Sequence, residues 1–210
     1  MVRLKTLGKN METKRQIREK YKKIRENLSK EEVMDYSEKI CEMIGKSTFY
    51  QKAEQIGCYY PLGKEVSLIP LVQKAWADGK VTLFPKVVGE DMFFYPITDF
   101  SQLEEGYFHV MEPDEALCQM ADWKFAQDEK TVILTPGVAF DKTGGRMGYG
   151  KGFYDRFFAK YPNCVRIGVC YEAQIADHLI LESHDRRLQY IITEQGKRES
   201  TLYKEERKCN

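Results

Sequence analysis

A glycine-rich loop between a predicted strand and a predicted helix restricts most strongly how this chain can fold. Five glycines fall within nine consecutive positions, at 144, 145, 148, 150 and 152. Glycine adopts positive φ easily and lets a ligand approach the backbone, and consecutive N–H groups in such a turn can form an anion-binding nest. Arg146 and Lys151 lie among the glycines. Two cations in such a loop favour phosphate as its ligand.

Two common phosphate-binding patterns do not describe this loop. A P-loop requires Ser or Thr where Gly152 stands, and it follows its strand directly, whereas here about ten residues intervene. The dinucleotide fingerprint requires glycine where Phe153 stands. The sequence therefore predicts a phosphate loop of another kind, although a flexible surface turn would also be rich in glycine.

The helix predicted after the loop supports an anion site. Its first N–H groups would face the loop, and such groups attract anions. Asp155 falls in the first turn of this helix, where a carboxylate could bind magnesium. An acid at this position could also serve only to stabilise the helix dipole.

Hydrophobic periodicity predicts alternating helices and strands. Helices are expected at residues 12–28, 29–45, 68–77 and 153–161, the second opened by a capping box at Ser29 and the third by Ser67. Strands are expected at residues 56–60, 81–84, 92–95, 131–135, 165–171 and 188–193, with Pro85 ending the second. Strands separated by helices predict a single α/β layered domain with a largely parallel central sheet and helices on both faces.

Composition narrows the class of protein. Lys and Arg total 33 and Asp and Glu total 32, so the net charge of +1 gives no support for nucleic-acid binding. Six cysteines show no metal-binding spacing, and no apolar run approaches the length of a membrane span. We therefore expect a cytoplasmic protein with reduced thiols and no membrane partner. A monomer is expected as well. Residues 1–196 are expected to form the domain, and residues 197–210 a charged peripheral tail.

The signature segment carries a resemblance to a known family. It reads Pro136-Gly-Val-Ala-Phe-Asp141, then Gly145-Arg-Met-Gly-Tyr-Gly-Lys-Gly-Phe-Tyr-Asp-Arg156. Weaker matches over roughly residues 13–194 are Lys14-Arg-Gln-Ile-Arg18, Tyr60-Pro-Leu-Gly-Lys-Glu-Val66, residues 106–113 ending in Glu-Pro, and His184-Asp185. The chain resembles the 5-formyltetrahydrofolate cyclo-ligase family, also called 5,10-methenyltetrahydrofolate synthetases. Where the family often has a second acid four residues after the aspartate, this chain has Gln189.

The resemblance implies a fold and a reaction. The fold would be an α/β layered sheet of the CoA-transferase-like class. The enzyme would use Mg²⁺ and ATP to phosphorylate the formyl oxygen of 5-formyltetrahydrofolate. Attack by N10 would then close the ring and give 5,10-methenyltetrahydrofolate, ADP and phosphate.

The resemblance also assigns residues to roles, and phosphoryl transfer depends mainly on positioning and charge neutralisation. Arg146 and Lys151 would be catalytic, and Asp155 and Asp185 would bind magnesium. ATP would contact Lys14, Arg15, Arg18, Arg146, Met147, Gly148, Tyr149, Gly150, Lys151, Gly152, Phe153 and Tyr154. The folate would contact Tyr60, Glu65, Tyr149, Gly150, Lys151, Gly152 and Phe153.

Simpler interpretations stay open for several of these residues. Lys14–Arg18 could be a solvated basic face, which is the preferred interpretation for Arg15. Glu65 could be a turn acid, while Tyr60 and Phe153 could belong to the core. At the level of function, the alternatives are a non-catalytic folate- or nucleotide-binding protein and a nucleic-acid-binding module that uses the basic first helix.

Overall fold

A seven-stranded sheet forms the centre of the computed structural model, which describes residues 12–106, 109–121 and 130–202. Its strand order is β12-β11-β9-β6-β1-β2-β3. The strands are β1 (Gln55–Gly57), β2 (Val81–Val88), β3 (Asp91–Ile97), β6 (Thr131–Thr135), β9 (Val165–Val169), β11 (Tyr190–Thr193) and β12 (Gly196–Glu199). The five inner strands are parallel, and β3 and β12 are antiparallel edges. The expected largely parallel sheet is confirmed.

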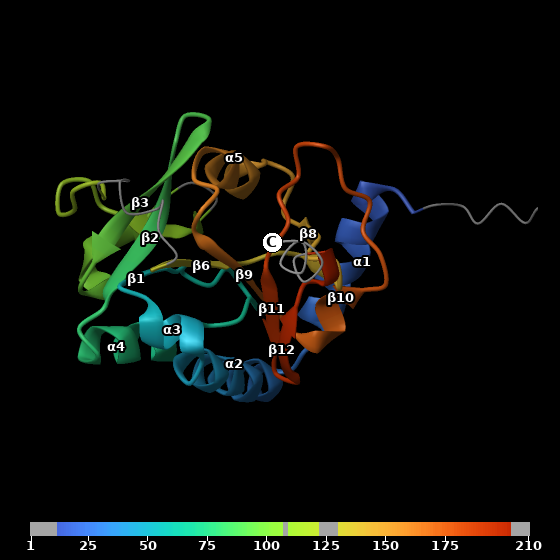
Figure 1. The fold of residues 1–210 in the computed structure, drawn as a ribbon, viewed down its shortest axis with the longest axis horizontal. Helices are drawn as coiled ribbons and strands as arrows, with labels where there is room; N and C mark the ends of the chain where they lie inside the picture. The colour runs from blue at the N-terminus through green and yellow to red at the C-terminus, as the bar shows by residue number, and fades with distance from the viewer. Residues whose placement is uncertain (1–11, 107–108, 122–129, 203–210) are drawn as a thin grey trace, which may run out of the picture.

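Helices cover both faces of this sheet, as predicted (Figure 1). Helices α2 (Lys30–Gly45), α3 (Thr48–Lys52) and α4 (Ile69–Ala77) lie on one face and α5 (Phe153–Lys160) on the other, while α1 (Lys14–Glu26) packs on a second, smaller sheet. Side chains alternate between the two faces along β6. Val132 and Leu134 pack in the core under α2 and α4, whereas Ile133 packs with Phe157 of α5. The loop that ends at α5 is thereby anchored above one face.

A small second sheet supports the first helix. It consists of β10 (Ile175–Ala176), β7 (Ala139–Asp141) and β8 (Arg146–Met147). Ile17 and Tyr21 of α1 pack against Val138, Ala139 and Met147 in one buried cluster. Two further strands, β4 (Leu103–Glu105) and β5 (Met111–Pro113), pair with each other. The signature segment therefore forms a hairpin, β7–β8, that holds the N-terminal helix beside the glycine loop.

Two predicted boundaries in β2 and α4 were wrong. Strand β2 continues through Pro85 to Val88 because β1 ends before that point. The Leu83 carbonyl accepts from the N–H of Cys58, the residue that follows β1, so the nitrogen of Pro85, two residues on, faces the same side beyond this contact and loses no partner. The N-cap of α4 is Leu68, without a side-chain cap, and not Ser67. The capping box at Ser29 is confirmed.

The C-terminal segment also differs from the expectation of a peripheral tail that begins at residue 197. Lys197–Glu199 belong to β12, which pairs with β11 in the central sheet. Ser200 is buried, and its Oγ donates to the Thr143 carbonyl at 2.8 Å. Residues 203–210, the rest of the expected tail, lie outside the described residues. Among the described helices, none has both the length and the apolarity that a bilayer span requires.

Candidate functional site

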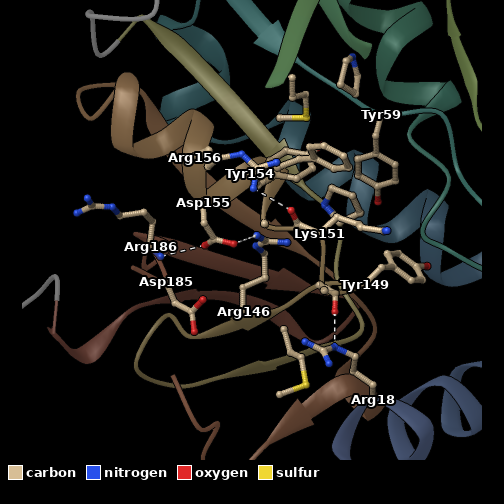
Figure 2. Close-up of a pocket in the computed structure, with 18 of the residues that line it drawn as sticks. Arg18, Tyr59, Arg146, Tyr149, Lys151, Tyr154, Asp155, Arg156, Asp185 and Arg186 are labelled. Carbon is tan, nitrogen blue, oxygen red and sulfur yellow. Dashed lines mark hydrogen bonds and ion pairs between the residues drawn. The ribbon is translucent and has the colours of Figure 1, made fainter. Parts of the chain in front are cut away.

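A cavity of about 900 Å³ lies where three distant segments of the chain meet. Helix α1 forms one wall, the segment from Tyr59 to Glu65 another, and the glycine loop with the start of α5 a third. Residues 180–186 and parts of β2, β3 and β5 also line it, so both halves of the sequence contribute. Figure 2 shows the Arg146 and Asp155 side chains directed toward one another with Asp185 nearby, whereas the Arg186 side chain points away from this group. The volume lies in the upper part of the range for small-molecule sites.

The glycine loop requires glycine at two positions where its backbone reverses. Gly150 has φ +97°, and Gly152, the N-cap of α5, has φ +69°. Both values lie where residues with a Cβ are strained. The Arg18 guanidinium lies against Gly150, 3.4 Å from where a Cβ would stand, and donates from Nε to the Gly148 carbonyl at 3.0 Å. The loop is therefore folded directly onto α1.

Lys14, Arg146, Asp155 and Asp185 form what we call the charged cluster. Arg146 Nη2 lies 3.0 Å from Asp155 Oδ2, and the backbone N–H of Arg186 donates to Asp155 Oδ1 at 3.0 Å. Lys14 Nζ lies 3.1 Å from Asp185 Oδ2. The turn at residues 184–186 thus brings Asp185 to the same cavity as Asp155. The two cations offset their charge.

The charges of the Lys14–Asp185 pair are stabilised by the contacts around it. Partial burial raises the pKa of Asp185, but the Glu182 N–H and the Lys14 ammonium outweigh it and leave the pKa below its ordinary value. For Lys14, burial lowers the pKa, whereas Glu182 and Asp185 raise it further, so the net shift is upward. Both groups therefore stay ionised over the neutral range.

Helix α1 presents only one of its faces to the cavity. Lys14, Arg18 and Lys22 line it, as their four-residue spacing places them on one helical face. The side chain of Arg15 is 88% exposed and pairs with Glu19 on the solvent side of the helix. The expectation that Arg15 contacts ATP is therefore not met by its position, because the helix turns it to solvent.

The buried Arg25 and Glu65 side chains, together with the partly exposed Tyr149, form a group that we call the Glu65 cluster. Arg25 Nη1 lies 3.3 Å from Glu65 Oε1, the Tyr149 hydroxyl donates to the same oxygen at 2.7 Å, and Arg25 Nη2 donates to the Tyr149 hydroxyl at 2.8 Å. The Leu62 N–H donates to Glu65 Oε2 at 3.1 Å. Burial raises the pKa of Glu65, and the contacts with Arg25 and Tyr149 only partly oppose it.

Aromatic side chains provide flat surfaces around these charges. Tyr60 and Phe153 line the cavity, and the Arg146 guanidinium lies 5.2 Å from the centre of the Tyr154 ring. The Tyr154 hydroxyl is buried and has no hydrogen-bond partner among the described residues. Met147 borders the cavity but is mostly buried against α1. Rings and an unpartnered hydroxyl suit a ligand that combines apolar faces with polar edges.

The candidate metal ligands fit a magnesium ion that arrives with a nucleotide. No group of three or more His, Cys, Asp or Glu side chains that could bind a metal occurs in the described ranges. Mg²⁺ commonly uses one or two carboxylates together with substrate phosphates and water. Asp155 and Asp185 both line the cavity and supply two carboxylates of this kind. Gln189 lies apart from them, with its Oε1 accepting from the Arg166 N–H of β9.

Sequence reasoning missed Lys22, Arg25 and Arg186. The spacing of Lys14, Arg18, Lys22 and Arg25, at intervals of four, four and three residues, could have revealed the first two. Arg186 contributes to the charged cluster through its backbone N–H, so its side-chain type gave no signal.

Comparisons with known proteins identify relatives along nearly the whole chain. A family profile for the 5-formyltetrahydrofolate cyclo-ligase family matches residues 10–194. The chain is 29% identical over 198 residues to a probable 5-formyltetrahydrofolate cyclo-ligase of Caenorhabditis elegans, covering 87% of this chain and 93% of that protein. It is 26% identical over 212 residues to the 5-formyltetrahydrofolate cyclo-ligase of Saccharomyces cerevisiae, covering 89% and 97%.

A solved structure agrees with these sequence matches. The 5,10-methenyltetrahydrofolate synthetase of Aquifex aeolicus superposes with a TM-score of 0.77 at 31% identity, over 90% of this chain and 93% of that one. The fold, the signature segment and the profile match lead to one conclusion: this chain belongs to the 5-formyltetrahydrofolate cyclo-ligase family.

Proposed function

We propose that this protein converts 5-formyltetrahydrofolate to 5,10-methenyltetrahydrofolate and uses ATP, with release of ADP and phosphate. One observation carries the proposal: a single cavity gathers cations suited to phosphate and a buried carboxylate suited to N–H donors. Lys14, Arg18, Arg146 and Lys151 are the cations, and Glu65 is the carboxylate. Membership of the family supports the same substrate class.

The chemistry needs an activated formyl oxygen, because an amide carbon is a poor electrophile. The formyl oxygen forms a bond to the γ-phosphorus as the bond between that phosphorus and the β,γ-bridging oxygen breaks. N10 then adds to the formyl carbon and loses its proton, the carbon–oxygen bond breaks, and the departing phosphate takes up that proton. Arg146 and Lys151 neutralise charge on the transferring phosphoryl group, and electrostatic stabilisation of this kind often contributes most of the rate enhancement in such a site.

The other residues bind and orient the two substrates. Lys14 and Arg18 neutralise phosphate oxygens from the α1 side, and the loop N–H groups from Gly148 to Gly152 approach them closely. Asp155 and Asp185 would hold magnesium, which shields phosphate charge when it is bound. Glu65 accepts from N–H groups of the pterin, with Tyr60, Tyr149 and Phe153 beside its ring.

A spectrophotometric assay tests the proposal. Purified protein with magnesium, ATP and 5-formyltetrahydrofolate should show growing near-ultraviolet absorbance of the methenyl product, together with one ADP for each product. Omission of ATP should abolish the change. No ATP-dependent product across a range of protein, metal and substrate concentrations would contradict the proposal and favour a non-catalytic binding protein.

A further inference from the structure

The Arg25–Glu65 pair lies at the boundary between the cavity and the protein interior. Both side chains are only 6% exposed. Among the described residues, Glu65 belongs to the cavity lining and Arg25 does not. Arg25 therefore lies behind the Glu65 carboxylate and the Tyr149 hydroxyl and would act on a ligand through these two groups.

We propose that Arg25 is a positioning residue, which fixes the orientation of the Glu65 carboxylate toward the substrate and balances its buried charge. This inference rests on the proposed function, because it assigns Glu65 to folate recognition. Arg25 itself takes no part in bond making or breaking.

The contacts of Glu65 show which of its partners could give way to a substrate. An ionised carboxylate offers about four acceptor positions. Three are used: Oε1 accepts from Arg25 and from the Tyr149 hydroxyl, and Oε2 accepts from the Leu62 N–H. Tyr149 is 43% exposed and belongs to the glycine loop, where Gly150 gives the backbone freedom. Its hydroxyl is the partner that a substrate N–H can replace, whereas Arg25 and Leu62 stay in place.

The electrostatic surroundings of Glu65 make Arg25 important for its charge. Burial is the largest influence on the pKa of Glu65 and raises it, and Arg25 is the strongest opposing influence. On the other packed elements, the buried tyrosines Tyr59, Tyr154 and Tyr171 lie close enough to interact electrostatically with Glu65. Phenols are neutral in this range and do not replace a cation. Without Arg25, the carboxylate would protonate more easily and lose acceptor capacity.

Arg25 also shows a feature that packing alone does not explain. Its Nε is buried and has no hydrogen-bond partner among the described residues. A buried donor without a partner is unfavourable. The two Nη contacts, to Glu65 and to Tyr149, therefore explain why the guanidinium is held in this position. The same helix face carries Lys14, Arg18 and Lys22, which brings one helix to both clusters.

The test is a mutant cycle between Arg25 and Glu65, with steady-state kinetics for both substrates. For R25Q, we expect KM for 5-formyltetrahydrofolate to rise about 10- to 100-fold, the range for loss of a charged hydrogen bond. KM for ATP should stay within about twofold. In the E65Q background, R25Q should add little further loss, because the residue through which it acts is already changed.

A pH profile separates positioning from a purely structural role. The acidic limb of kcat/KM for the folate should move to higher pH in R25Q and return toward the wild-type position in R25K, which keeps the charge. If R25Q does not fold, R25M takes its place in the cycle and in the pH profile, with thermal melting as a check on folding.

Two results would overturn the inference. The first is an R25Q loss that is as large in the E65Q background as in the wild type. The second is an equal rise in KM for both substrates together with an unchanged acidic limb. These results are distinct from failure of the proposed function, in which the wild-type protein itself makes no ATP-dependent product.

Discussion

The charged cluster and the Glu65 cluster both pair carboxylates with basic side chains, but at different depths. In the charged cluster, the side chains of Asp155 and Asp185 are 13% and 16% exposed. In the Glu65 cluster, Glu65 is 6% exposed. The surroundings lower the pKa of Asp185 and raise that of Glu65. One cavity therefore holds an acid that is firmly ionised and another whose charge depends on its neighbours.

The difference in burial between the two clusters explains how one cavity can bind two kinds of substrate. Partly solvated ion pairs can open and exchange partners when a phosphate and its metal ion enter, because water and the ligand replace what is lost. A deeply buried carboxylate cannot be rehydrated so easily. It suits a fixed set of N–H donors on a neutral ring. The predictions below change one cluster at a time.

The largest effect is expected for Arg146→Ala. We expect kcat to fall about 10²- to 10³-fold through loss of charge neutralisation. The free energy of unfolding should also fall by about 3 kcal/mol, because Asp155 keeps a partly buried charge without its partner. Kinetics and urea unfolding measure the two losses. An unchanged kcat in a protein of lowered stability would make Arg146 structural only.

Lys151→Ala should lower kcat by a similar factor with little change in stability, since Lys151 is exposed in the loop. Its backbone carbonyl accepts from Arg156 Nη1 at 2.9 Å, a contact that the substitution leaves in place. Lys142→Ala, an exposed lysine outside the cavity lining, is the matched control. Full activity of the Lys151 variant would remove it from the catalytic set.

Asp155→Asn should raise the magnesium concentration needed for half-maximal activity about tenfold, the loss typical of one charge-assisted contact. The amide keeps the size of the side chain but removes its charge. A magnesium titration of initial rates measures the shift. If the titration curve stayed where it is in the wild type, Asp155 would not be a metal ligand.

Arg18→Ala and Arg15→Ala compare the two faces of α1. Arg18 borders the cavity and donates to the Gly148 carbonyl, so its loss should raise KM for ATP about tenfold. Arg15 is exposed and pairs only within the helix surface, a contact worth little. We expect its variant to match the wild type. Equal effects of the two substitutions would argue for a general charge effect of the helix.

The smallest expected effect is a difference between two pH profiles. A raised pKa means that Glu65 takes up its proton at higher pH than an ordinary glutamate, so kcat/KM for the folate should fall first on acidification. The pKa of Asp185 is lowered, so ATP binding through the charged cluster should persist to lower pH. Profiles measured for each substrate in turn check this order, and coincident acidic limbs would contradict it.

Local patterns predicted much of the fold. The strand at Thr131–Thr135, the glycine loop and the helix from Phe153 are encoded by neighbouring residues, and all are present. The continuation of β2 through Pro85 depends on where β1 ends, which the sequence around the proline does not show. Strand β12 likewise depends on β11 as its partner. Charge in the segment after residue 196 suggested a tail, but pairing decided its structure.

Contacts between residues of one local motif were predictable from the sequence. Contacts between residues far apart in the sequence were not. Arg146 and Asp155 lie nine residues apart in the signature, and their pairing follows from one loop and one helix turn. Arg25 and Glu65 lie forty residues apart, and no local pattern links them. Arg15 was grouped with Arg18 because adjacent basic residues look alike in sequence. Helical geometry separates them.

The central claim is that the two clusters of one cavity serve different substrates. Calorimetric titration of the Glu65→Gln protein with 5-formyltetrahydrofolate and with a non-hydrolysable ATP analogue tests it most directly. We expect affinity for the folate to fall at least about tenfold, while affinity for the analogue with magnesium stays at the wild-type value. Equal weakening of both ligands, or unchanged binding of the folate, would contradict the claim.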